Sequence, residues 1–128
     1  MACLHYQVEQ PQGKLVRVVR GAIYDVAVDV RRSSPTFGRW AGCVLSADNG
    51  LQSWIPAGMA HGFLALGDGA EVCCKATSYH APDLERCLRW DDPVIGVAWP
   101  LEQTGLVAPR LSARDAAATG WHDANLLP

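Results

Sequence analysis

The stretch IYDVAVDV at residues 23–30 decides the fold class. In an extended chain its valines fall on one side, whereas Asp25, Ala27 and Asp29 fall on the other. A helix would scatter these two sets around its circumference. The alternation therefore predicts a β-strand with one face in a core and one face in water.

Similar short runs recur on both sides of this stretch and are separated by residues typical of turns. They cover residues 14–20, 39–45, 51–55, 61–66, 71–79, 86–90 and 95–99. Eight strands of this length predict an all-β fold, a jelly-roll sandwich or barrel, in a single domain over residues 1–128. The sequence predicts one short C-terminal helix near Ser112–Ala118, where Ser112 can cap the first turn.

Composition limits the function classes. The 128 residues include 49% hydrophobic types, as expected of a globular domain, and carry a formal net charge of −2. No apolar run approaches the ~20 residues of a membrane helix, and the N-terminus lacks signal-peptide features. Eleven basic residues against thirteen acidic ones give no basic patch for nucleic acid. We expect a cytoplasmic protein that binds neither nucleic acid nor membrane.

The residues LHYQ at 4–7 form a further strand-like run close to the start of the chain. A first strand that begins so early usually leaves the edge of its sheet exposed. Exposed edges pair with other chains. We therefore expect a homodimer.

Two histidines stand in suggestive positions. Gly50, Pro56, Gly58 and His61 have the spacing of the second cupin motif, in which a glycine-proline turn presents a histidine into a barrel. The His-x-His pair of metal-binding cupins is missing from the sequence, and His5 with His61 supplies too few ligands for a divalent ion. We predict a cupin without metal or other cofactor; a metal-dependent cupin oxygenase or isomerase is an alternative.

Several linked segments then resemble one family, the dTDP-4-dehydrorhamnose 3,5-epimerases. Their order and spacing agree from about Leu4 to Asp115. The segments are LHYQ (4–7), QGKLVR (12–17), DVAVD (25–29), SPTFG (34–38), WIP (54–56), AHGF (60–63) and RWDDP (89–93). The resemblance implies a metal-independent cupin epimerase, usually dimeric, that inverts C3 and C5 of a nucleotide-linked 4-keto-6-deoxyhexose in dTDP-L-rhamnose biosynthesis.

The resemblance also implies roles for individual residues. His5 matches the catalytic base, and Asp115 matches the carboxylate that orients it. Lys14 matches the lysine at the C4 oxygen, and His61 matches a histidine that contacts the substrate. Structural alternatives exist for each: Asp115 can belong to a capping box with Ser112, Lys14 can be a surface lysine, and a histidine on a strand can be structural.

The sequence departs from the family pattern at three places. Cys74 stands where the family has a tyrosine that acts as the general acid, and Tyr79 is a candidate substitute. Ala2 and Cys3 replace an arginine and a glycine, and the family's N-terminal segment is expected to be missing. These departures keep a second interpretation open, a truncated or impaired cupin that binds a sugar nucleotide or a partner without turnover.

Overall fold

The computed structural model describes residues 4–9, 11–79, 81–101, 118–124 and 126–128. Its strands are β1 (Leu4–Gln7), β2 (Lys14–Asp29), β3 (Trp40–Ser46), β4 (Gln52–Ile55), β5 (Met59–Ala76) and β6 (Glu85–Leu88). Two single 3-10 turns, η1 (Pro82–Leu84) and η3 (Trp121–Asp123), accompany them. The all-β prediction is confirmed, whereas the predicted helix falls almost entirely on residues outside the described ranges. In the part of the chain described, no helix is long and apolar enough to cross a membrane.

Two of the strands are longer than predicted, because β2 and β5 each join two of the expected strands. The joints are bends at glycines with positive φ, Gly21 (80°), Gly67 (62°) and Gly69 (114°). The pairing register of β2 with β5 also shifts next to Gly21, as at a β-bulge. A Cβ on Gly21 would lie 2.3 Å from the carbonyl oxygen of Gly69. The residues expected to form turns therefore bend continuous strands instead.

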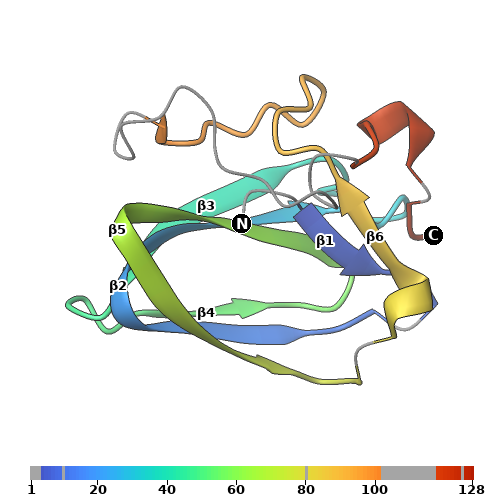
Figure 1. The fold of residues 1–128 in the computed structure, drawn as a ribbon. Helices are drawn as coiled ribbons and strands as arrows, with labels where there is room; N and C mark the ends of the chain where they lie inside the picture. Colours follow the sequence, from blue (N-terminus) through green and yellow to red (C-terminus); the bar gives the residue numbers. More distant parts are fainter. Residues whose placement is uncertain (1–3, 10, 80, 102–117, 125) are drawn as a thin grey trace.

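These bends fold the antiparallel sheet over itself into two layers (Figure 1). The upper layer contains β3, residues 22–28 of β2, residues 59–66 of β5, and then β1 and β6. The lower layer contains β4, residues 14–17 of β2 and residues 73–76 of β5. An inner core joins the layers, with Val16, Val18 and Ile55 from below and Ile23 and Leu45 from above. The inner faces of the two layers thus enclose the barrel interior.

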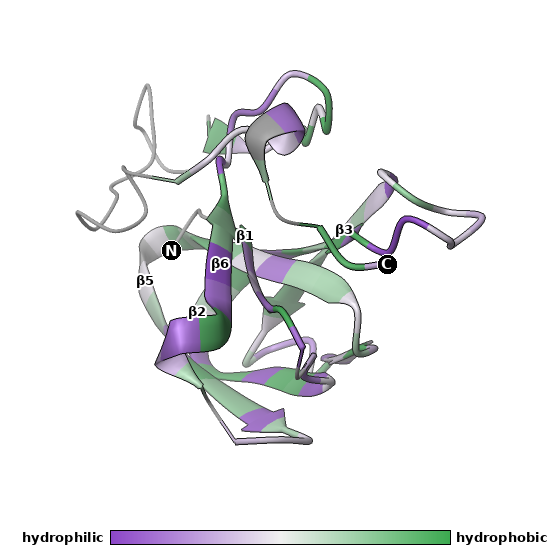
Figure 2. Cartoon of the chain, turned by 90° about the vertical axis from the view of Figure 1, so that its right-hand side faces the viewer, coloured by the Kyte–Doolittle hydropathy of each residue, from purple (hydrophilic) through white to green (hydrophobic). Residues whose placement is uncertain are grey.

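A second core covers the outer face of the upper layer. It joins strand residues such as Tyr6 and Val28 to Ile95, Trp99 and Trp121 from the C-terminal part of the chain. Residues 95–99, predicted to form a strand, contain none and contribute core side chains instead. Figure 2 shows mostly hydrophobic strands interrupted by short hydrophilic stretches.

The stretch at residues 23–30 alternates as predicted, but neither of its faces is in water. Asp25 and Asp29 are only 2% and 1% exposed. The lower layer covers the face that carries Asp25, and Asp29 accepts hydrogen bonds from Arg31, Ser34 and Thr36. The prediction of a solvent-facing acidic side is therefore wrong, because a folded-over sheet buries both sides of its central strand.

The first strand is not a sheet edge. β1 pairs with β5 on one side and with β6 on the other. The exposed-edge argument for a dimer is therefore wrong for β1, and the dimer stays a prediction.

Candidate active site

Strand pairing places the two histidines side by side on the inner face of the upper layer. His5 of β1 lies opposite His61 of β5, and His61 lies opposite Ala27 of β2. Ala27 packs against the inner core. His5 and His61 are 8% and 3% exposed. Both imidazoles therefore belong to the barrel interior, as the cupin spacing predicts for His61.

His5 has a carboxylate beside its ring. Nδ1 of His5 lies 2.8 Å from Oε1 of Glu85, and the two side chains are only 10% and 13% exposed. On the other side of the ring, Sγ of Cys87 lies 3.9 Å from Nε2. A carboxylate at one nitrogen stabilises the imidazolium and leaves proton exchange to the other nitrogen. Asp115, the predicted orienting carboxylate, lies outside the described residues.

His61 has its own carboxylate, which the sequence analysis missed as a site residue. Nε2 of His61 lies 2.5 Å from Oδ1 of Asp25, and both side chains are buried. Asp25 lies on β2, the strand next to that of His61, two residue pairs further along and opposite Phe63. An acidic residue inside a valine-rich strand is the feature of the sequence that could have indicated Asp25 as a site residue. That His61 is its partner follows only from the pairing register of β2 with β5.

Lys14 lies on the inner face of the lower layer. Val16 of the inner core has the same orientation on β2, and Cys74 lies opposite Val16, so Lys14 and Cys74 are diagonal neighbours. Burial lowers the pKa of Lys14, and the nearby Cys74, Glu85 and Asp25 oppose this shift. Because Glu85 contacts His5 and Asp25 contacts His61, the lysine shares one electrostatic environment with both histidines.

Two thiols also belong to the inner faces. Cys43 of β3 lies opposite Asp25 of β2, and Cys74 of β5 lies opposite Val16 of β2. Both are exposed free cysteines, and Cys73 is free as well. Burial raises the pKa of each inner thiol, and the negative charge of Asp25 adds to both shifts, while Lys14 opposes that of Cys74.

Tyr79, the other candidate acid, is 94% exposed and lies beyond the end of β5. Its phenol therefore points to solvent, away from the inner surface that carries the histidines.

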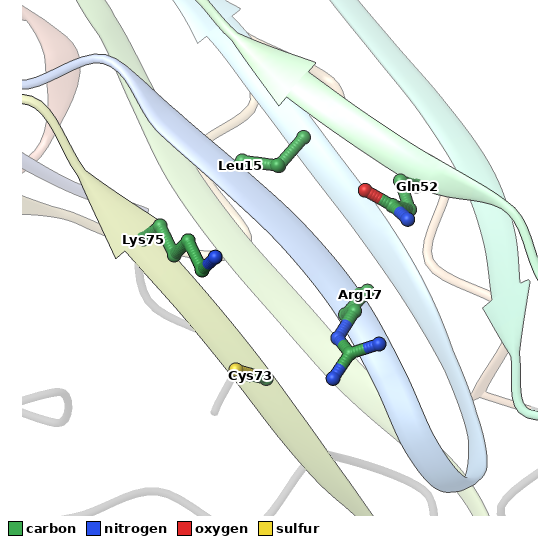
Figure 3. A pocket seen from close by; sticks show the side chains of 5 residues that line it. All are labelled: Leu15, Arg17, Gln52, Cys73 and Lys75. Atoms are coloured by element: carbon green, nitrogen blue, oxygen red, sulfur yellow. The ribbon is translucent and has the colours of Figure 1, made fainter.

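A groove on the opposite face of the lower layer carries none of the predicted site residues. It has a volume of about 230 Å³ and is lined by Leu15, Arg17, Gln52, Cys73 and Lys75. Figure 3 shows these side chains, which belong to β2, β4 and β5. Residues alternate between the faces of a strand, so Cys73 and Lys75 point away from the inner surface that holds Cys74. Lys75 thus lies outside the candidate site.

The interior combines an imidazole beside a carboxylate, an ammonium group and a thiol. This set can remove a proton next to a carbonyl group, stabilise the resulting enolate and return a proton to carbon. Among the described residues, no three His, Cys, Asp or Glu side chains are grouped to hold a metal ion.

Comparisons with known proteins agree on one family. The family profile described as dTDP-4-dehydrorhamnose 3,5-epimerase matches residues 1–123. A Neisseria gonorrhoeae protein of that name is 57% identical over 121 residues, which are 94% of this chain and 36% of the relative. A Pseudomonas aeruginosa protein of that name is 51% identical over 125 residues, which are 98% of this chain and 67% of the relative.

Solved structures show the same likeness. The Legionella pneumophila dTDP-6-deoxy-D-glucose-3,5-epimerase in complex with dTDP-4-keto-L-rhamnose has a TM-score of 0.85 and 47% identity. It matches 91% of this chain and 60% of its own. A Mycobacterium tuberculosis epimerase has a TM-score of 0.88 and 40% identity, over 94% of this chain and 60% of its own.

The chain thus spans 36% and 67% of the length of the two relatives and 60% of each solved structure. The likeness confirms the cupin-type all-β fold and the resemblance that the sequence motifs indicated. The chain belongs to the dTDP-4-dehydrorhamnose 3,5-epimerase family.

Proposed function

We propose that the protein is an isomerase that epimerises C3, C5 or both carbons of dTDP-4-keto-6-deoxyglucose, in the biosynthesis of dTDP-L-rhamnose. The observation that carries the proposal is the joint placement of His5, its neighbour Glu85 and Lys14 on the barrel interior. Relatives named for this reaction, and the Legionella structure with dTDP-4-keto-L-rhamnose, supply the substrate class.

In this proposal His5 is the base. It removes a proton from the carbon next to the C4 ketone, and Glu85 stabilises the imidazolium that forms. The ammonium group of Lys14 faces the C4 oxygen, where enolate charge develops. His61, held by Asp25, contacts the substrate, and Asp115 is a second proposed partner of His5. The reaction as proposed uses no metal or other cofactor.

A second candidate function is binding of the sugar nucleotide without turnover. Cys74 favours it, because a thiol stands where the family's general acid is a tyrosine. The two functions differ in one observable: only turnover exchanges the protons next to the ketone with solvent.

The test is incubation with dTDP-4-keto-6-deoxyglucose in deuterated water, followed by NMR and mass spectrometry of the sugar. We expect deuterium at C3, C5 or both, together with inversion. Calorimetric binding of dTDP combined with an unlabelled sugar at high enzyme concentration would support the second function instead. Loss of both signals would contradict both functions.

We also propose a homodimer that works in the cytoplasm. The exposed Trp54 and Leu51, 57% and 54% exposed at the β4 edge of the lower layer, support association. Light scattering at micromolar protein concentration measures the mass of the particle in solution, which should be that of two chains. Replacing Trp54 with Ser should weaken a dimer that uses this edge. Fractionation of the cells that produce the protein tests its location.

A further inference from the structure

We propose that Cys74 is a catalytic residue, the proton donor on the face of the sugar opposite His5, so that inversion at carbon depends on this thiol. The inference rests on the proposed function and deepens it, since it assigns the second of the two proton-transfer groups that epimerisation requires. A single base can exchange a proton with retention. Inversion needs a proton from the other face of a planar intermediate.

His5 and Cys74 lie in opposite layers of the folded sheet. His5 is on β1 in the upper layer and faces inward beside His61. Cys74 is on the lower-layer part of β5 and faces inward beside Val16, a fully buried residue of the inner core. Strand β1 and the lower-layer end of β5 lie in opposite layers (Figure 1). The imidazole and the thiol, which the pairing registers place on the inner faces, therefore face the barrel interior from opposite sides.

Lys14 connects these two groups. It is the diagonal neighbour of Cys74 on the lower layer, and its charge interacts with Glu85, which lies 2.8 Å from His5. An enolate whose oxygen is held at the ammonium group of Lys14 can present one face to each layer. One face then meets the imidazole and the other meets the thiol.

The thiol has the properties of a proton donor. Cys74 is a free cysteine and is exposed, so ligands and solvent reach it. Burial of part of the side chain raises its pKa, so the thiol carries its proton at neutral pH. Tyr79, at 94% exposed, points away from the interior and does not compete for the role.

The proton transfers balance without any co-reactant. Nε2 of His5 takes the proton, and the electron pair of the C–H bond becomes the double bond of the enolate. On return, that electron pair takes the proton of the Cys74 thiol, which forms the new C–H bond and leaves a thiolate beside the Lys14 ammonium. Water then returns a proton to the thiolate and removes one from the imidazolium, which restores both groups.

The test uses the full chain in deuterated water and measures two rates on the same sugar, deuterium incorporation and inversion. In Cys74→Ala we expect inversion to fall about 10²- to 10⁴-fold, the usual range for a lost general acid. Incorporation with retention should continue, because His5 still exchanges its proton with solvent. Cys73→Ala removes the adjacent thiol on the outer face and serves as the matched control. Cys74→Tyr supplies a phenol and should recover inversion relative to Cys74→Ala.

The outcomes separate this inference from the proposed function. Unchanged inversion in Cys74→Ala, with incorporation by the wild type intact, would overturn the donor role and leave the epimerase function standing. An equal loss of incorporation and inversion would also overturn it, since that pattern indicates damage to the whole site. A wild type that incorporates no deuterium would overturn the function and the donor role together.

A second measurement does not depend on turnover. Labelling with N-ethylmaleimide, followed by peptide mapping, reports the accessibility of each cysteine. We expect the dTDP-sugar to slow labelling of Cys74 and to leave Cys73 unchanged. Equal labelling of Cys74 with and without saturating sugar nucleotide would contradict its place at the reacting carbon.

Discussion

Glu85 is the residue whose replacement tests the site geometry most sharply. Its carboxylate lies 2.8 Å from Nδ1 of His5, and both side chains are nearly buried. The substitution Glu85→Gln keeps the size of the side chain and removes its charge. We expect a lower rate of proton abstraction, because the imidazolium that forms loses its neutralising partner.

The magnitude follows from the distance and the burial. Opposite charges about 4 Å apart at an effective dielectric constant of about 20 attract by about 4 kcal/mol. The cost of keeping both groups out of water offsets part of this, so we expect a net loss of about 2–3 kcal/mol. At about 1.36 kcal/mol per tenfold change, kcat falls about 30- to 160-fold.

The assay is steady-state turnover of the dTDP-sugar as a function of pH, with thermal unfolding as the check on folding. The base must be neutral, so activity falls at low pH, and removing the carboxylate should move this acidic limb to lower pH. The control is Glu71→Gln, which removes an exposed carboxylate that pairs with Arg20. Unchanged kcat and an unchanged acidic limb in Glu85→Gln would refute the reasoning, as would an equal loss in the control.

Three further substitutions test other parts of the account. Lys14→Met should reduce kcat about 10²- to 10³-fold by removing the group at the enolate oxygen. Burial lowers the pKa of Lys14, so the ammonium group loses its proton at a lower pH than an ordinary lysine does. Wild-type activity should therefore decline at that lower pH as the solution becomes more alkaline. Asp25→Asn should raise KM by weakening the hold on His61, and lower stability by about 1–3 kcal/mol because a buried hydrogen bond is impaired; calorimetry and steady-state kinetics measure both. Asp29→Asn should lower the free energy of unfolding by about 1–3 kcal/mol at pH 7, since it removes the charge with which the buried Asp29 carboxylate pairs with the partly exposed Arg31. Burial alone would raise the pKa of the Asp29 carboxyl, but its hydrogen bonds outweigh this and hold the pKa well below its usual range. The carboxylate of Asp29 therefore stabilises the fold fully above the pKa that it has in the unfolded chain, and this stabilisation is lost as the pH falls toward its pKa in the folded protein. The urea midpoints of the wild type and of Asp29→Asn should therefore converge in acid. A constant difference between the two midpoints across pH would contradict this.

The sequence predicted the strands well and their connections less well. The alternation at residues 23–30 gives a strand because only a period of two places its valines on one side. The glycines at 21, 67 and 69 were expected to end strands, whereas they bend them. A glycine with a positive φ is compatible both with a turn that ends a strand and with a bend inside a strand. Which of the two forms depends on whether the chain on both sides of the glycine pairs with the same neighbouring strand.

The candidate site shows the same division. His5, Lys14 and His61 were found through motifs, and the register brings them to one interior. Asp25 and Glu85 were missed because each meets its histidine across a strand pair, which local sequence does not specify. Asp25 was also assigned to water, since alternation reports two faces but not whether a second layer covers one of them.

The most direct test of the central claim, that His5 removes the proton next to the ketone, is the rate of deuterium incorporation from solvent into dTDP-4-keto-6-deoxyglucose. We predict incorporation at C3, C5 or both by the wild type and its loss in His5→Ala, with exposed His122→Ala as the matched control. Incorporation by folded His5→Ala at the wild-type rate would contradict the account.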